Sequence, residues 1–78
     1  MKDKYKSYYQ EIGERIIFYR TRRGMSQEEL ALQINCSPEY LNQIENYDVN
    51  SDFSWSIDLL FAISDALKIN ILIFLGCF

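Results

Sequence analysis

The chain has 78 residues with a formal net charge of −3, and 49% of its residues are hydrophobic while 15% are aromatic. This length predicts one small domain with a single core over residues 1–78, and the acidic balance by itself argues against a nucleic-acid partner. The charges are unevenly spread, because residues 1–23 carry seven basic and three acidic side chains whereas residues 24–78 carry one basic and eight acidic. Such an asymmetry can orient an electrostatic interaction, although a solvated first helix would produce the same pattern.

Several chemistries lack the residues that they need. The chain has no histidine, and Cys36 and Cys77 lie 41 positions apart, which excludes the usual zinc spacings and a CxxC redox pair. We therefore expect no metal and no cofactor, and we expect both cysteines to act as small hydrophobic residues in a reducing cytoplasm. The chain opens with polar residues rather than a signal peptide, and the apolar ending "INILIFLGCF" is too short to cross a bilayer. No membrane partner is expected.

The first predicted helix covers residues 6–23, and residues 1–5 are expected to form a flexible arm before it. Apolar residues recur there at steps of three and four, which is typical of a helix with one buried face. This stripe consists of Tyr8, Ile12, Ile16 and Tyr19. Gly24 supplies the C-terminal stop.

Two short helices follow, each with a recognisable start. Ser26 can cap the second helix and Glu29, three residues later, completes a capping box. Ser37 can cap the third helix, with Pro38 at the first helical position, where its missing N–H is not needed. The third helix is expected to end near Asn46. The residues expected to face inward are Leu30, Ala31, Ile34, Leu41 and Ile44.

A polar loop over residues 46–54 precedes the fourth predicted helix, residues 55–68. The main apolar face of that helix is expected to hold Ile57, Leu60, Phe61, Ser64 and Leu67, widened by Leu59 and Ile63. Asn70 can cap a short fifth helix, residues 71–76, that is apolar almost all round. No segment predicts a strand, so the expected fold class is all-α with five helices.

The corner between the second and third helices has the residues that a helix-turn-helix requires. Ala31 is small enough for two crossing backbones to approach closely. Asn35 is among the few non-glycine types that tolerate left-handed backbone geometry. The remaining positions carry apolar side chains that can reach one core: Leu30, Ile34, Cys36, Leu41 and Ile44.

The sequence resembles the lambda-repressor-like, or Cro/C1-type (Xre), helix-turn-helix DNA-binding proteins from about Ile12 to Leu75. The resemblance rests on "IGERIIFYR", "GMSQEELA", "CSPEYLNQIE" and "SIDLLFAISDALKIN". It implies a five-helix lambda-repressor-like domain with the helix-turn-helix at helices two and three. Arg20 and Glu45 match the family's buried ion pair, and Gln27 matches its phosphate-contacting glutamine. An exposed Gln27 without a role is the simpler alternative.

In such proteins the third helix enters the major groove of double-stranded DNA. Asn and Gln can pair with adenine and Glu with cytosine, whereas plain solvation of these side chains is the alternative. The residues expected to contact DNA are Gln27, Ser37, Pro38, Glu39, Tyr40, Asn42, Gln43 and Asn46, with Arg15, Arg22 and Arg23 of the first helix. The arm residues Lys2, Lys4 and Lys6 are further candidates for phosphate attraction.

Two departures from the family pattern predict weak binding by each monomer. The usual basic residues in and after the third helix are absent, and Tyr47 stands where a glycine is common. With few phosphate contacts, the dependence of binding on salt should be shallow.

The end of the chain carries more apolar residues than one small core is expected to use. Segment 69–78 is therefore predicted to form a homodimer interface. A homodimer would strengthen the weak DNA binding of each monomer by raising the effective concentration of the second one. The residues expected there are Ile69, Ile71, Ile73, Phe74 and Phe78. Closure of the monomer core by these residues, or contact with a different protein, is the alternative.

The leading interpretation is a homodimeric transcriptional regulator that reads two DNA half-sites, either as a repressor or as a restriction–modification-type controller. The competing hypothesis is a protein-interaction module, antitoxin-like or anti-repressor-like, that binds a protein partner through its acidic face. An enzyme is not expected, because the chain lacks histidine, a phosphate-cradling glycine loop and an evident pair of catalytic carboxylates.

Overall fold

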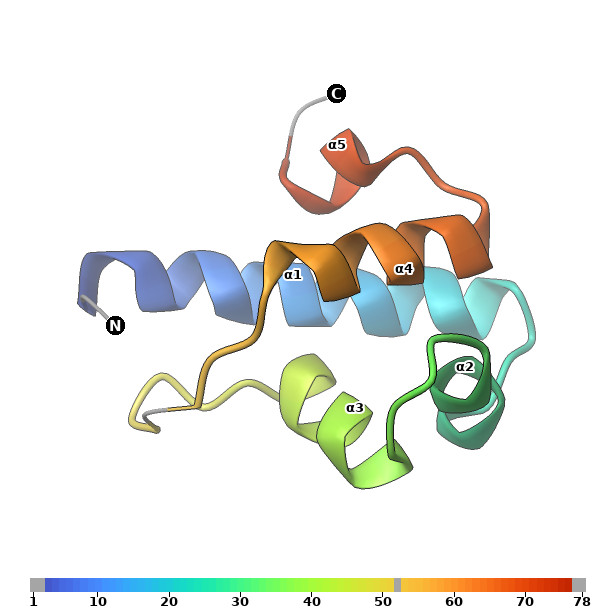
Figure 1. Cartoon of the computed structure of the whole chain (residues 1–78). Helices are drawn as coiled ribbons and strands as arrows, with labels where there is room; N and C mark the ends of the chain where they lie inside the picture. Colours follow the sequence, from blue (N-terminus) through green and yellow to red (C-terminus); the bar gives the residue numbers. More distant parts are fainter. Residues whose placement is uncertain (1–2, 52, 77–78) are drawn as a thin grey trace.

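The computed structural model describes residues 3–51 and 53–76, with side chains from Tyr5 onward. Within this part of the chain the elements are α1 (Asp3–Arg22), α2 (Gln27–Gln33), α3 (Pro38–Glu45), α4 (Ile57–Leu67) and α5 (Ile71–Phe74) (Figure 1). The prediction of an all-α domain with five helices is confirmed for these residues, which form no strand. None of the described helices combines the length and the hydrophobicity needed to span a membrane.

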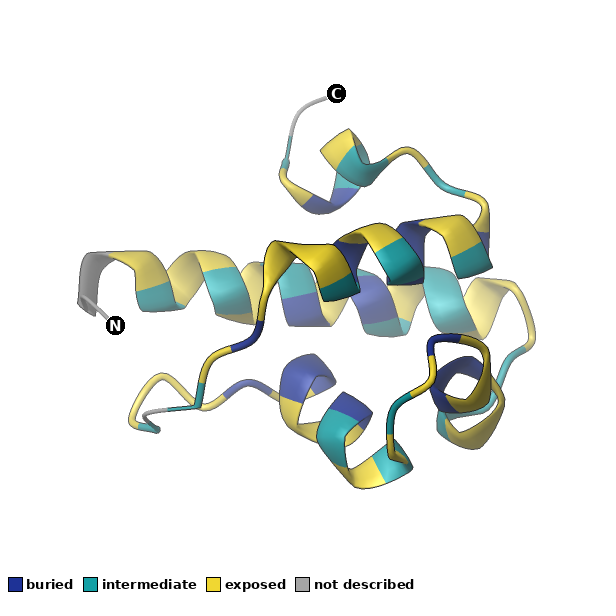
Figure 2. Cartoon of the chain, viewed as in Figure 1, coloured by how far each residue is buried: buried dark blue, intermediate teal, exposed yellow. Residues whose placement is uncertain are grey.

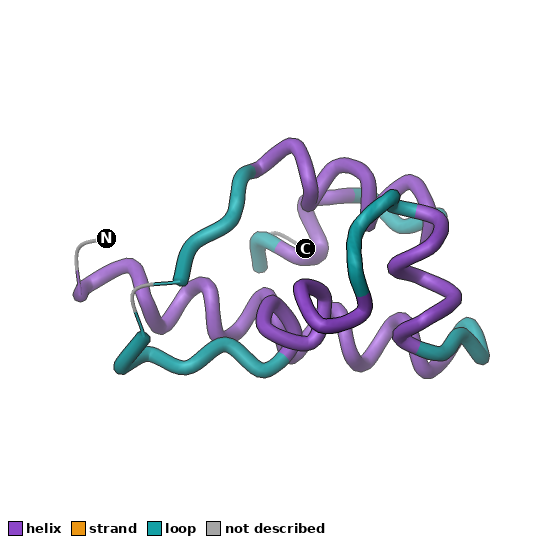
Figure 3. Tube along the Cα trace, turned by 60° about the horizontal axis from the view of Figure 1, so that its bottom comes forward, coloured by secondary structure: helices purple, strands orange, loops and turns teal. Residues whose placement is uncertain are grey.

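Helix α1 runs through the middle of the molecule and contacts α3, α4 and α5 (Figure 1). Helices α2 and α3 lie on one side of it, and α5 lies on the other. Helix α2 is held by α3 and α4. The loop between α3 and α4 runs alongside the N-terminal half of α1 (Figure 3). This arrangement leaves one face of the α2–α3 pair open to solvent.

Every helix contributes at least one fully buried side chain to a single core (Figure 2). These residues are Ile16, Leu30, Leu41, Ile44, Leu60, Ile63, Leu67 and Phe74. Burial of a large aliphatic or aromatic side chain contributes about 1.5–3 kcal/mol. Because the members come from five separate segments, the helices stabilise one another rather than standing alone.

Helix α1 begins at Asp3, three residues before its predicted start, so residues 3–5 of the expected arm are helical. Residues 1–2 of that arm, including Lys2, lie outside the described residues. No glycine or proline precedes Gly13, so no residue in this stretch opposes a helix. Local propensity therefore extends the helix further than its apolar stripe.

The buried stripe of α1 was misassigned at its first position. Tyr8 is 60% exposed, whereas Tyr9 packs against the core. The ring of Tyr9 stacks on Tyr47 with centroids 5.6 Å apart, and meets Trp55 edge-on at 5.5 Å. Both tyrosines are spaced correctly for a helical stripe with Ile12, so only these distant aromatic partners decide between them.

Helix α4 begins at Ile57 rather than at residue 55, and its buried face is rotated from the predicted one. Ile57 and Phe61 are 52% and 50% exposed, so their assignment to the main core face was wrong. The buried residues of the helix are Leu60, Ile63, Ser64 and Leu67. Helix α5 ends at Phe74 rather than at residue 76, and its predicted cap is confirmed, because the Asn70 side chain accepts a hydrogen bond from the Leu72 N–H.

Gly13 allows α1 and α3 to pack backbone against backbone. A Cβ atom at this position would lie 2.8 Å from the carbonyl oxygen of Glu45, closer than real Cβ contacts. That oxygen belongs to the main chain at the end of α3, so it cannot swing aside as a flexible side chain would. The sequence pattern gave no sign of this requirement, because a glycine inside a helix usually has only a propensity effect.

We expect Gly13→Ala to lower the free energy of unfolding by about 1–3 kcal/mol, because overpacking outweighs the gain in helix propensity. Urea denaturation followed by circular dichroism measures the change. Ser7→Ala, on the exposed surface of the same helix, is the matched control and should be neutral or slightly stabilising. A Gly13→Ala protein at least as stable as the wild type would contradict the close approach.

Candidate functional site

The start of α2 forms the predicted capping box. Ser26 Oγ accepts a hydrogen bond from the Glu29 N–H at 3.1 Å, and Glu29 Oε1 accepts one from the Ser26 N–H at 2.9 Å. Hydrogen bonds from the Ser26 backbone and hydroxyl hold the pKa of the Glu29 carboxyl below its usual value. A lowered folded-state pKa means that this stabilisation is present above about pH 4.5 and is lost as the pH falls through the folded pKa.

The corner between α2 and α3 has the predicted geometry. Asn35 adopts the left-handed conformation with φ 60°, and the Cys36 N–H donates to the Ala31 carbonyl at 3.0 Å. Ser37 Oγ then accepts from the Tyr40 N–H at 3.1 Å and caps α3. These short-range bonds turn the chain sharply, so that α3 packs across α2 with its outer face free.

Arg20 and Glu45 form the ion pair that the family resemblance implied. Arg20 Nε lies 2.7 Å from Glu45 Oε2, and Arg20 Nη2 lies 3.1 Å from Glu45 Oε1. The Glu45 side chain is fully buried, and Arg20 Nη1 also donates to the Met25 carbonyl at 2.8 Å. A bidentate pair of this kind joins α1, the turn before α2 and the end of α3.

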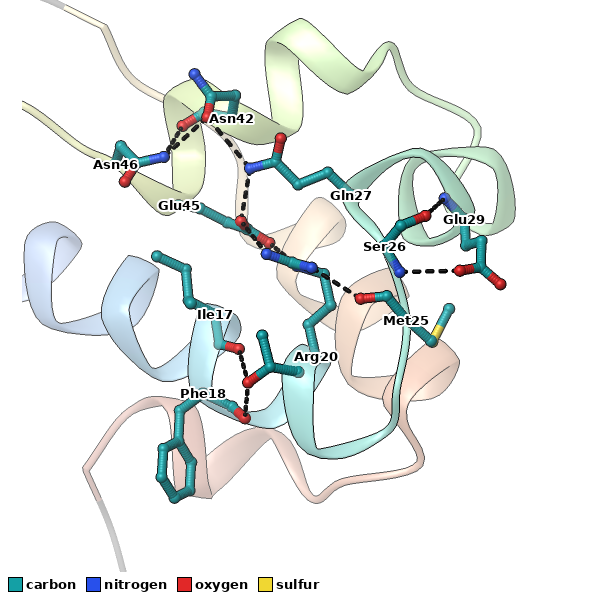
Figure 4. Close-up of polar contacts among 11 residues, drawn as sticks. Ile17, Phe18, Arg20, Met25, Ser26, Gln27, Glu29, Asn42, Glu45 and Asn46 are labelled. Carbon is teal, nitrogen blue, oxygen red and sulfur yellow. Dashed lines mark hydrogen bonds and ion pairs between the residues drawn. The ribbon is translucent and has the colours of Figure 1, made fainter.

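Gln27 extends this contact toward the surface (Figure 4). Its Nε2 donates to Glu45 Oε1 at 2.8 Å and to Asn42 Oδ1 at 3.2 Å. Asn46 Nδ2 donates to the same Asn42 Oδ1 at 2.8 Å. A buried carboxylate is therefore linked by three side-chain amides to the outer face of α3. We call Gln27, Asn42 and Asn46 the amide row.

The outer face of α3 is exposed, as predicted for Glu39, Asn42, Gln43 and Asn46. A shallow hollow of about 530 Å³ lies beside it, lined by Gln27, Pro38, Glu39, Asn42 and Gln43. Tyr40 flanks this face, half-buried with its ring 5.3 Å from that of Phe53. The structure thus brings together the residues predicted on α2 and α3, and Ser37 is occupied as the helix cap.

The three predicted arginines of the first helix are not brought to this face. Arg15 Nη1 donates to the Phe74 carbonyl at 3.3 Å, and Arg23 Nη2 donates to the Lys68 carbonyl at 3.2 Å. Arg22 lies over the ring of Phe18, 4.4 Å from its centroid. Phe18 points away from α3 (Figure 4). The arginines serve helix ends and an aromatic ring on the side of α4 and α5, so the geometry gives no support to their predicted contact with DNA.

The predicted interface segment, residues 69–78, is largely part of the monomer. Phe74 is fully buried, and Ile69 and Ile71 are half-buried against the core. Ile73 is also half-buried, and Phe78 lies outside the described residues. The assignment of Phe74 to a dimer surface was therefore wrong, because the core of one chain already covers it. Within residues 69–76, the exposed apolar side chains are Leu72 and Leu75.

Among the described residues, no group of three or more cysteine, aspartate or glutamate side chains is placed to hold a metal ion. A family model described as "Helix-turn-helix" matches residues 16–74, which include all of α2 to α5 and the end of α1. The search of curated proteins gave no match.

Glu45→Ala should lower the free energy of unfolding by about 3–5 kcal/mol, because it leaves Arg20 and Gln27 without their common acceptor. This is a large fraction of the stability of a small domain, so loss of the helical circular dichroism signal at 25 °C is an equally acceptable result. Glu39→Ala removes an exposed carboxylate from the same helix and should change the stability by less than about 0.5 kcal/mol. Equal denaturation midpoints for the two variants would contradict the role of the buried pair.

Proposed function

Because the chain belongs to the Cro/C1-type helix-turn-helix family, whose members are DNA-binding domains, we propose that it is a sequence-specific transcriptional regulator. In this proposal α3 lies in the major groove of double-stranded DNA. The observation that carries it is the outer face of α3, where Asn42 and Gln43 are exposed beside an open hollow. The buried pair of Arg20 and Glu45 holds that face at a fixed angle to the rest of the domain.

Base recognition would rest on side-chain amides. Asn and Gln offer hydrogen-bond donors and acceptors to base edges without carrying charge. Glu39, at the first turn of α3, offers an acceptor to a cytosine amino group. The amide row fixes Asn42 before DNA arrives, so less side-chain freedom is lost on binding.

Phosphate attraction would be small. Arg20 is paired internally, and Arg15, Arg22 and Arg23 are directed toward α4, α5 and Phe18. Lys6 lies at a second hollow, beside Val49 and Asn50 in the loop after α3, where a DNA backbone leaving the groove could pass. Each phosphate neutralised contributes about −0.9 to the slope of log affinity against log salt. A monomer with one or two such contacts would show a slope of about −2 or smaller in magnitude.

A homodimer would compensate for weak single sites. Leu72 and Leu75 are the exposed apolar side chains of the last helical segment, at 48% and 45% exposure. Their pairing with the same residues of a second copy would set two α3 helices toward successive half-sites about 10 base pairs apart. When two DNA-binding domains are joined in a dimer, binding of the first raises the effective concentration of the second at its half-site. The affinity of the dimer therefore rises without any new contact to DNA.

A second candidate function has an observation in its favour. The exposed surface of α2 and the start of α3 carries Glu28, Glu29 and Glu39, whereas Arg15 and Arg23 donate to carbonyls near α5 and α4. An acidic face of this kind suits a basic protein partner, such as a toxin or the target of an anti-repressor. In that case the helix-turn-helix would serve as a protein-binding scaffold.

Selection of bound duplexes from a random pool, followed by a gel shift at several salt concentrations, tests the regulator. Asn42→Ala and Gln43→Ala should each weaken binding to the selected site by about 1–3 kcal/mol and relax the base preference. The double variant Arg22→Ala/Arg23→Ala is the matched control, and it should bind as the wild type does because both side chains point away from α3. If no duplex is retained at low salt, the protein-binding alternative is favoured.

Leu72→Asp, which places a charge in the proposed dimer surface, should shift the protein from dimer to monomer in sedimentation equilibrium. Ile57→Asp adds the same charge at an exposed apolar residue of α4 and is the control. We expect Leu72→Asp to keep the helical content of the wild type, since the side chain is half exposed. A wild-type protein that stays monomeric at micromolar concentration, with and without its selected duplex, would refute the dimer.

A further inference from the structure

Glu45 determines which way the Gln27 amide points. A carboxylate can only accept hydrogen bonds, so the atom of Gln27 that lies 2.8 Å from Glu45 Oε1 is its NH2 group. The Glu45 side chain is fully buried and its charge is held by Arg20, so its acceptor role is fixed. Reversal of the Gln27 amide would set its oxygen against the carboxylate.

The same constraint passes from Gln27 to Asn42. Gln27 Nε2 has two protons, and its second acceptor is Asn42 Oδ1 at 3.2 Å. Asn46 Nδ2 donates to this oxygen at 2.8 Å, so both of its lone pairs are used. Asn46 Nδ2 also lies 3.2 Å from the backbone carbonyl of Asn42. Reversal of Asn42 would set its NH2 group against two other NH2 groups.

Each side-chain amide of the amide row therefore has one defined orientation. That orientation determines whether its NH2 group or its oxygen is left for a binding partner. Asn42 leaves its NH2 group for a partner, so it acts only as a donor (Figure 4). Gln27 and Asn46 keep their oxygens for a partner, so they act as acceptors. Because both Nε2 protons are used inside the protein, the geometry does not favour the phosphate contact that the family resemblance implied for the Gln27 side chain.

We propose that Asn42 is a fixed hydrogen-bond donor that selects guanine over adenine in the major groove, with Gln27 and Asn46 as its positioning residues. This inference rests on the proposed DNA-binding function. An asparagine free to choose its orientation pairs with adenine, because N6 donates and N7 accepts. Guanine presents two acceptors, O6 and N7, on the same edge. A donor held outward by Glu45 matches guanine and meets the adenine amino group with a second donor.

The first experiment examines the orientation without DNA. Nuclear magnetic resonance couplings across hydrogen bonds should connect Gln27 Nε2 with the side-chain carbonyl carbons of Asn42 and Glu45. The amide of the exposed Gln43 is the internal reference and should rotate faster than that of Gln27. A coupling from Asn42 Nδ2 to the Gln27 carbonyl carbon overturns the proposal. Rotation of the Gln27 amide as fast as that of Gln43, without the expected couplings, overturns it as well.

The second experiment selects duplexes with wild-type protein and with two variants. Wild type should prefer guanine over adenine by about tenfold at the base pair whose selection is lost in Asn42→Ala. Asn42→Asp keeps the acceptor for Gln27 and Asn46 but turns an acceptor outward, so this position should change to cytosine, whose N4 donates. Gln27→Ala/Asn46→Ala frees the Asn42 amide, so the guanine preference should fall to about twofold or less.

The outcomes separate the two proposals. Arg22→Ala is the control and should keep the guanine preference. A selected site with adenine at the Asn42 position overturns the fixed-donor inference and leaves the regulator standing. Retained guanine preference in Gln27→Ala/Asn46→Ala also overturns the inference, because the positioning residues would then have no effect. A pool that yields no bound duplex for any protein overturns both.

Discussion

The buried carboxylate of Glu45 accepts hydrogen bonds from side chains of two other helices. A buried charge strongly destabilises a fold unless donors surround it. Here Arg20 and Gln27 supply those donors, and they come from α1 and α2 while Glu45 ends α3. The charge is therefore satisfied only when three helices take up their native positions. This requirement acts on orientation as much as on stability, because apolar packing alone would tolerate small rotations of α3.

The internal use of charge has a consequence for the surface. Arg20 is paired with the buried Glu45, while Arg15 and Arg23 donate hydrogen bonds to main-chain carbonyls near the ends of α5 and α4. These bonds hold the two cations on the side of α4 and α5. The α3 face carries the hydrogen-bonded amides of Asn42 and Asn46, the exposed amide of Gln43 and the carboxylate of Glu39. Such a surface suits discrimination between hydrogen-bonding partners better than general attraction to a polyanion.

The last helix shows how a small domain completes its core. Phe74 is fully buried and its ring meets that of Tyr19 edge-on, 5.8 Å between centroids. Its backbone carbonyl accepts from Arg15, so α5 is tied to α1 by a polar contact as well. A chain of this length buries a modest share of its surface and cannot leave such a residue unused. Leu72 and Leu75, by contrast, are exposed to solvent.

Local sequence alone predicts three features of the fold: the capping box of Ser26 and Glu29, the left-handed corner at Asn35, and the order of the helices. These follow from bonds within a few residues, so the chain encodes them locally. The remaining features come from packing between helices. This packing chose the buried face of α4, made Gly13 necessary and turned the arginines away from α3. It also gave the amide row its direction, because that direction originates in a carboxylate 18 positions from Gln27. The hydrophobic periodicity of a sequence predicts which side chains share a helix face. Only the elements packed against the helix determine which of its faces is buried.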